Sequence, residues 1–181
     1  SNIAQSIVNT SKNVVHTSTT AQNMIKNFQE TVKIYEQGKK YYDALKSVNN
    51  LVKDARKVQQ TILMVGDISD IYVTNFNTMT GDPNFTVEEL SAIAFGYNRL
   101  LKESSDLLLD LKEVTTATGL SMTDKERLDI INRIYGEVLE YKNLTWYYTR
   151  KNIGVSYLRS KEKGDAARVL SLYGTHEQRY W

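Results

Sequence analysis

The residues best suited to chemistry in this sequence are two pairs of carboxylates at helical spacing, Asp67 with Asp70 and Asp106 with Asp110. Such pairs could share a proton in acid–base catalysis or supply two ligands to a divalent cation. Aspartates three or four residues apart are also typical of the solvated face of a helix. The pattern therefore favours a solvated acidic surface over a catalytic or metal site at both pairs.

Other reactive side chains are scarce. The two histidines, His16 and His176, lie at opposite ends of the chain, and the sequence has no cysteine. A local metal site of histidine and cysteine ligands is therefore excluded, and so is thiolate chemistry. Phosphate-binding glycine loops and nucleophile elbows are also absent from the sequence. We expect a protein that is not an enzyme, with no catalytic residues, no cofactor, no metal and no small-molecule substrate.

Aromatic and basic residues alternate between Asn143 and Gly164, within a predicted helix. At about 100° per residue, this helix has two apolar sides. We assign one side to the core because upstream apolar residues such as Ile134 continue into it. That side carries Leu144, Tyr147, Tyr148, Val155 and Leu158. The opposite side carries Trp146, Arg150, Ile153 and Tyr157.

Packing between two helices requires only one apolar side, so the Trp146 side is an additional apolar surface. It could pack against a third helix or the C-terminal segment, or it could dock a partner protein, because large aromatic residues beside arginine make good interface anchors. Nucleic-acid stacking is disfavoured, since about half of the aromatic residues point inward. Trp146, Arg150, Ile153 and Tyr157 are therefore candidate interface residues, and the nature of their partner stays open.

Charge divides the chain into three segments. Nine Lys/Arg stand against four Asp/Glu in residues 1–64, six against fourteen in residues 65–140, and eight against three in residues 141–181. If the segments pack side by side, their charges favour one arrangement of neighbours. Pairing within the molecule is the simpler interpretation, and a basic patch for an external anionic partner is the alternative.

The elements that position these residues are long helices. One proline and nine glycines in 181 residues leave few interruptions, and no strand-like alternation is present. Capping boxes at Thr86/Glu89 and Thr123/Glu126 mark two helix starts. We predict an all-α single domain over residues 1–181, an elongated antiparallel three-helix bundle with short accessory helices. The predicted helices cover residues 2–64, 67–77, 86–118, 123–163 and 165–173.

The first predicted helix has a coiled-coil-like seam in steps of four and three, which begins at Ile7 and Val14. Serines interrupt the first third of this seam, so its beginning could fray or await a partner. Ile7 and Val14 therefore join the candidate interface. The pattern slips by one residue near Gly38, where the helix either bends or changes its buried face.

Several segments in order resemble one family of small proteins encoded in Bacteroidetes conjugative transposons and described as conjugal transfer proteins. The segments include "IVNTSKNVVHTSTTAQNMIKNFQET", "GKKYYDALKSVNNLVKDARKVQQ", "FTVEELSAIAFGYNRLL" and "NLTWYYTRKNIGVSYLRSKEKGDAARVLSLYG". The resemblance covers nearly the whole chain. More distantly, and by analogy, the family is similar to the minor-pilin subunit of type IV secretion systems, an elongated three-helix bundle.

The resemblance implies an exported protein, periplasmic or associated with the cell envelope. It also implies a structural component of a conjugative transfer apparatus that acts by protein–protein contact or adhesion. Its partners would be other transfer proteins or the recipient cell surface, and self-association is possible.

Two other classes stay open. One is a DNA-contacting accessory protein of conjugation that uses the basic first and last segments, although nucleic acid is the less favoured partner. The other is a membrane-active helical protein.

Overall fold

The computed structural model describes residues 40, 55–116 and 122–174, and helices make up nearly all of this part of the chain. The helices are α3 (Ala55–Thr80), α4 (Val87–Thr116), α5 (Asp124–Glu162) and α6 (Ala166–Tyr173). The described residues contain no strand. The predicted all-α class is therefore confirmed for them. Most of the predicted first helix, with Ile7, Val14 and Gly38, lies outside them.

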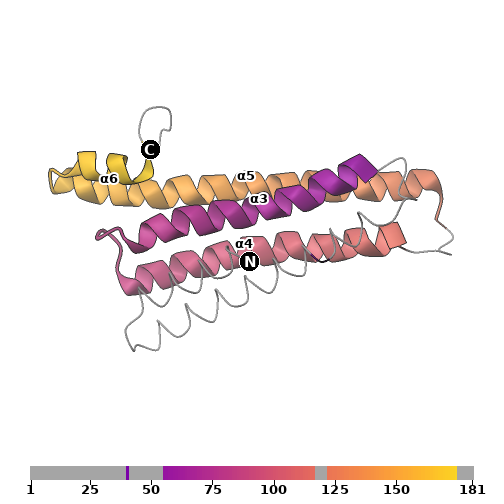
Figure 1. Ribbon diagram of the computed structural model, residues 1–181, viewed down its shortest axis with the longest axis horizontal. Helices are drawn as coiled ribbons and strands as arrows, with labels where there is room; N and C mark the ends of the chain where they lie inside the picture. The colour runs from indigo at the N-terminus through magenta and orange to yellow at the C-terminus, as the bar shows by residue number, and fades with distance from the viewer. Residues whose placement is uncertain (1–39, 41–54, 117–121, 175–181) are drawn as a thin grey trace.

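α3, α4 and α5 lie lengthwise against one another in a helical bundle (Figure 1). α4 runs antiparallel to the other two, so α3 and α5 run in the same direction. Two side-chain hydrogen bonds between α3 and α5 show that the two helices are parallel, because both join residues with the same offset in sequence. Lys57 donates to Asn132 and Lys142 donates to Asp67, and each pair is 75 positions apart. α5, with 39 residues, is about 58 Å long at 1.5 Å per residue.

The predicted interruption at Gly66 and Asp67 is wrong. The sequence indicated a first helix that ends near residue 64 and a short helix over residues 67–77, but α3 is continuous through both. A glycine inside a helix costs only about 1 kcal/mol relative to alanine, and apolar side chains such as the buried Ile68 offset that cost. The Asp67 carboxylate accepts a hydrogen bond from Lys142 of α5.

Both predicted capping boxes are present. The Thr86 hydroxyl accepts a hydrogen bond from the Glu89 amide at 3.2 Å, and the Glu89 carboxylate accepts one from the Thr86 amide at 2.9 Å. Thr123 and Glu126 make the same reciprocal pair at the start of α5. Each pair satisfies two backbone N–H groups that a helix end leaves unpaired. α4 and α5 therefore begin within one residue of the predicted positions.

The predicted break at Gly164 is also confirmed. Gly164 has a φ of 71°, a left-handed conformation that glycine adopts without steric cost. The amide of Asp165 then reaches the Ser160 carbonyl at 2.8 Å, and the Gly164 amide reaches the Lys161 carbonyl at 3.1 Å. This pair of bonds is a Schellman motif, which ends α5 and turns the chain back so that α6 packs against α5.

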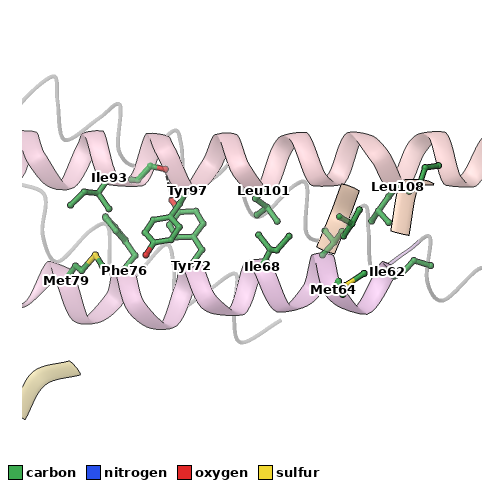
Figure 2. Close-up of a cluster of buried hydrophobic side chains, with 14 of the residues drawn as sticks. Ile62, Met64, Ile68, Tyr72, Phe76, Met79, Ile93, Tyr97, Leu101 and Leu108 are labelled. Atoms are coloured by element: carbon green, nitrogen blue, oxygen red, sulfur yellow. Dashed lines mark hydrogen bonds between the residues drawn. The ribbon is translucent and has the colours of Figure 1, made fainter. Parts of the chain in front are cut away.

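Aromatic residues occupy the centre of the core. Tyr72 of α3 and Tyr97 of α4 are fully buried, and their rings stack with centroids 4.7 Å apart (Figure 2). Phe76 meets both rings edge-on. Tyr148 of α5 meets Tyr97 edge-on at 4.9 Å. Edge-on and stacked contacts are the arrangements that the ring quadrupoles favour.

The phenol hydroxyls in this core have polar partners. The Tyr97 oxygen lies 2.6 Å from the Thr149 hydroxyl, which donates its own hydrogen to the Thr145 carbonyl at 2.8 Å. Tyr97 is therefore the donor in its bond with Thr149. Burial raises the pKa of Tyr97, which keeps this donor protonated. Tyr148 donates to the Ile93 carbonyl of α4 at 3.0 Å.

Gly96 is the position on α4 against which the Tyr148 ring packs. A Cβ atom at Gly96 would overlap the hydroxyl and ring of Tyr148, whereas one at Gly136 of α5 would meet nothing within 4 Å. We predict that Gly96→Ala displaces Tyr148, breaks its bond to α4 and lowers the free energy of unfolding by about 1–3 kcal/mol. Gly136→Ala, the matched control, should raise it by about 0.5–1 kcal/mol through helix propensity.

Urea denaturation of both variants, followed by circular dichroism, measures these changes. Equal stabilisation by the two alanines would contradict the close approach of Tyr148 to Gly96.

Candidate functional site

A buried polar cluster lies where the turn between α3 and α4 meets α5 and α6. Asp82, in that turn, is only 3% exposed. Its carboxylate accepts hydrogen bonds from the Ser156 hydroxyl of α5 and from the Tyr173 hydroxyl of α6 at 2.7 Å. It also accepts one from the backbone N–H of Asn84 at 2.9 Å. One carboxylate therefore ties the turn to two helices. Burial, followed by the bond to Asp82, raises the pKa of Tyr173 and keeps it a donor.

Asn84 completes this group, which we call the Asp82 cluster (Asp82, Asn84, Ser156, Ser160 and Tyr173). The Asn84 side-chain amide donates to Ser160 Oγ at 2.6 Å and to Ser156 Oγ at 3.1 Å. Its side-chain oxygen accepts from the Lys163 ammonium at 3.3 Å. The polar side chains of the cluster thus satisfy one another, as buried polar groups must.

The Asp82 cluster holds the bundle together and is poorly placed for catalysis. Ser156 beside Asp82 has the residue types of a nucleophile and a base. However, both side chains are buried, and the same carboxylate also binds Tyr173 and the Asn84 amide. A closed hydrogen-bonded network of this kind fixes the geometry of the helices that it joins.

An ion pair covers one side of the cluster. The Arg159 guanidinium donates to both oxygens of Glu89 at 2.7 and 2.8 Å and to the Asn84 carbonyl at 2.7 Å. The hydrogen bond from Arg159, with that of the Thr86 amide, lowers the pKa of Glu89 to about 2. The bond to Glu89 in turn raises the pKa of Arg159. Such a two-pronged bond fixes orientation as well as charge.

The Asp82 cluster was not predicted from the sequence. Its two parts, Asp82 with Asn84 and the residues of α5 and α6, are more than 70 positions apart, so no local motif joins them. The available signal was weak: an Asp-Pro-Asn turn, and two serines, Ser156 and Ser160, one helical turn apart. Serines at that spacing inside an amphipathic helix indicate a buried polar line that needs partners.

The outward face of α5 corrects the assignment made from the sequence. Leu144, Tyr147, Val155 and Leu158, expected in the core, are 47%, 53%, 40% and 54% exposed. With the exposed Lys151 they lie within about 80° of one another around the helix. We call this row the α5 stripe (Leu144, Tyr147, Lys151, Val155 and Leu158). Tyr148 alone of the predicted core row packs against the core.

From residue 145 onward, the inward face of α5 is built mainly from small polar residues, which explains the error. Thr145, Thr149, Ser156 and Ser160 are fully buried. They leave room for the large rings that α3 and α4 contribute, and Tyr97 bonds Thr149 directly. A ranking of faces by hydrophobicity therefore selects the wrong side of α5.

The candidate interface residues of the opposite side do not share one environment. Ile153 is 2% exposed and belongs to the core, so its side chain is not free for a partner. Trp146 and Tyr157 are half-buried, and Arg150 is exposed.

The predicted carboxylate pairs serve mainly as surface charges. Asp67 accepts from Lys142, and Asp106 accepts from Lys102 on the same helix. Partial burial, and then the neighbouring Asp67, raise the pKa of Asp70. Among the residues that the structure describes, no three His, Cys, Asp or Glu side chains are grouped so that they could hold a metal ion.

Charge pairing links the acidic and basic segments of the chain. Lys142 bonds Asp67 of α3 at 3.0 Å and Arg159 bonds Glu89 of α4 at 2.7 Å, so each pair joins α5 to another helix. Pairing within the molecule, the simpler interpretation of the charge pattern, is confirmed for these two bases. No helix in the described ranges combines the length and apolar character needed to cross a membrane.

Comparison with protein families gives a match at the start of the sequence. The family model described as "Domain of unknown function (DUF4141)" matches residues 1–28, which lie outside the described residues. No curated protein matches the chain. No solved structure matches it either.

The Asp82 cluster predicts a large cost when its carboxylate is removed. Asp82→Ala removes the acceptor of the buried Ser156 hydroxyl and of the half-buried Tyr173 hydroxyl. We expect the free energy of unfolding to fall by about 2–4 kcal/mol, since each unsatisfied buried group costs about 1–3 kcal/mol. Asp165→Ala, which removes a half-exposed pair with Arg168, should cost less than about 1 kcal/mol. Chemical denaturation of both variants tests this, and equal losses would contradict the prediction.

The Glu89 ion pair predicts a dependence of stability on pH. Because the pKa of Glu89 in the folded state lies below its usual value of 4.5, the pair stabilises the fold above pH 4.5. This stabilisation is lost as the pH falls from 4.5 to about 2. In Glu89→Gln, the free energy of unfolding should fall less steeply across that window. Urea titrations at several pH values measure the slope, and the exposed neighbour Glu88→Gln is the control. Identical slopes for wild type and Glu89→Gln would refute this assignment.

Proposed function

We propose that this protein is an elongated, antiparallel three-helix bundle that works by contact with other proteins, as a structural component of a conjugative transfer apparatus. The observation that carries the proposal is the α5 stripe. Four large apolar side chains lie exposed in one row on the longest described helix. An exposed row of large apolar side chains on one helix face is typical of an interaction site.

The rigidity of the bundle supports the same proposal. In the described part of the bundle, apolar side chains pack into one core. Hydrogen bonds of the Asp82 cluster and of the Tyr97 and Tyr148 phenols join the helices as well. A rigid rod holds an exposed face in one shape, which lowers the entropy lost on docking. The transfer apparatus and the cell envelope as the site of action rest on the resemblance of the sequence to conjugal transfer proteins.

The alternative, a DNA-contacting accessory protein, has less support from the described basic residues. Lys142 and Arg159, two of the bases in the last segment, bond carboxylates of the same molecule. Arg168 bonds Asp165. Fewer bases are therefore available for phosphate contacts than the sequence alone suggests.

The proposal predicts the outcome of a mating assay. Deletion of the gene from a transfer-competent element should abolish transfer, and the wild-type gene should restore it. The double variant Val155→Asp/Leu158→Asp should fail to restore it, because charges on the α5 stripe oppose docking. Leu109→Asp should restore it, since Leu109 is an exposed leucine of α4, away from the stripe.

Circular dichroism and thermal denaturation must show that both variants are folded. Transfer that is unchanged by deletion would refute the role in conjugation. Full restoration by the double variant would refute the role of the stripe.

A further inference from the structure

The charges around the α5 stripe follow a symmetric pattern. Lys151 lies at its middle, and the exposed Glu140 and Glu162 lie eleven residues before and after it. The steps from Glu140 through the stripe to Glu162 are 4, 3, 4, 4, 3 and 4 residues. This spacing averages about 3.67 residues per turn, so the row stays on one face of a nearly straight helix. The face therefore reads negative, apolar, positive, apolar, negative.

From this pattern we propose that the α5 stripe binds the α5 stripe of a second copy of this chain, antiparallel, about a two-fold axis between Leu144 and Tyr147. This inference rests on the proposed function, because it names one partner of the same face. In this register Leu144 lies opposite Tyr147 of the second copy, and Glu140 lies opposite Lys151. Two-fold symmetry forms each contact twice.

Charge selects this register over the other symmetric ones. A parallel pairing, or an antiparallel one centred on Lys151, places Lys151 against Lys151 of the second copy. An axis between Val155 and Leu158 would pair Lys151 with Glu162, but α5 ends at Glu162, so the helices would overlap only over residues 151–162. The proposed register overlaps residues 129–162, a length of about 50 Å.

The proposed register also defines which of the other residues on this face meet. Gly136 would lie opposite Val155, and the space above Gly136 is open to receive it. Arg133 would lie opposite Leu158. At each end of the overlap Asp129 would meet Glu162, a like-charge contact, and the nearby Arg133 is paired with Glu137 of its own helix.

The central residues are available for pairing. Neither Glu140 nor Lys151 forms an ion pair among the residues that the structure describes. The Lys151 ammonium lies 5.3 Å from the centroid of the Tyr147 ring. This cation–π contact already restricts the Lys151 side chain. Lys151 therefore loses less conformational entropy when it pairs with Glu140 of the second copy.

The test is sedimentation equilibrium of the full chain at low salt over a range of concentrations. Wild type should show a monomer–dimer equilibrium. Leu144→Asp should leave only monomer. Lys151→Glu and Glu140→Lys should each weaken dimerisation by about tenfold, because symmetry counts each surface pair twice. The double variant Glu140→Lys/Lys151→Glu should restore it, since the opposite charges meet again.

The control is the triple variant Asp129→Lys/Lys151→Glu/Glu162→Lys, which keeps like charges where residues 129 and 162 meet and should not restore dimerisation. Restoration by this variant would overturn the proposed register. A wild-type chain that stays monomeric throughout, or a dimer that is indifferent to Leu144→Asp, would overturn the proposal itself.

The mating assay separates this inference from the proposed function. If wild type is monomeric but Val155→Asp/Leu158→Asp blocks transfer, self-association fails and the contact role stands. If charge exchange controls the dimer but every variant supports transfer, the dimer stands and the role in transfer fails.

Discussion

The packing of large rings against small polar side chains is the contact on which the described bundle depends. Tyr72 and Tyr97 fill the centre, and α5 comes close enough to enclose them because it presents Thr149 and its small neighbours there. Large apolar residues on that face of α5 would fill the same space twice, and overpacking of a dense core is destabilising. Gly96 of α4 follows the same principle, because the Tyr148 ring occupies the space that a side chain at position 96 would fill. Because the face of α5 with the small polar residues packs inward, the α5 stripe faces outward.

The Asp82 cluster fixes how far the helices can slide along one another. Apolar contacts along three helices tolerate small slides, whereas hydrogen bonds do not. By joining the α3–α4 turn to Ser156 and Tyr173, Asp82 fixes the relative heights of α3, α5 and α6. A buried charge contributes little net stability compared with a well-packed apolar group, so its main effect here is to specify one arrangement.

Local signals in the sequence predicted the helix ends well. Thr86 and Thr123 with their glutamates start α4 and α5, and Gly164 ends α5, because caps depend on residues three or four positions apart. The continuity of α3 through Gly66 was missed because packing outweighs a local preference of about 1 kcal/mol. The inward face of α5 was missed for a related reason. Its residues are buried by what α3 and α4 place opposite them, and the sequence of α5 does not contain that information. The Asp82 cluster depends likewise on positions distant in the sequence.

The parallel course of α3 and α5 has a mechanical consequence. The chain enters α3 at Ala55 and reaches Tyr173 beside the α3–α4 turn, at the opposite end of α3, about 39 Å away for 26 residues (Figure 1). Tension applied between these two points acts along the helix axes and loads the contacts in shear. Many side-chain contacts must then yield together, whereas a peeling load would break them one at a time. The described part of the molecule is therefore built to resist stretching along its length.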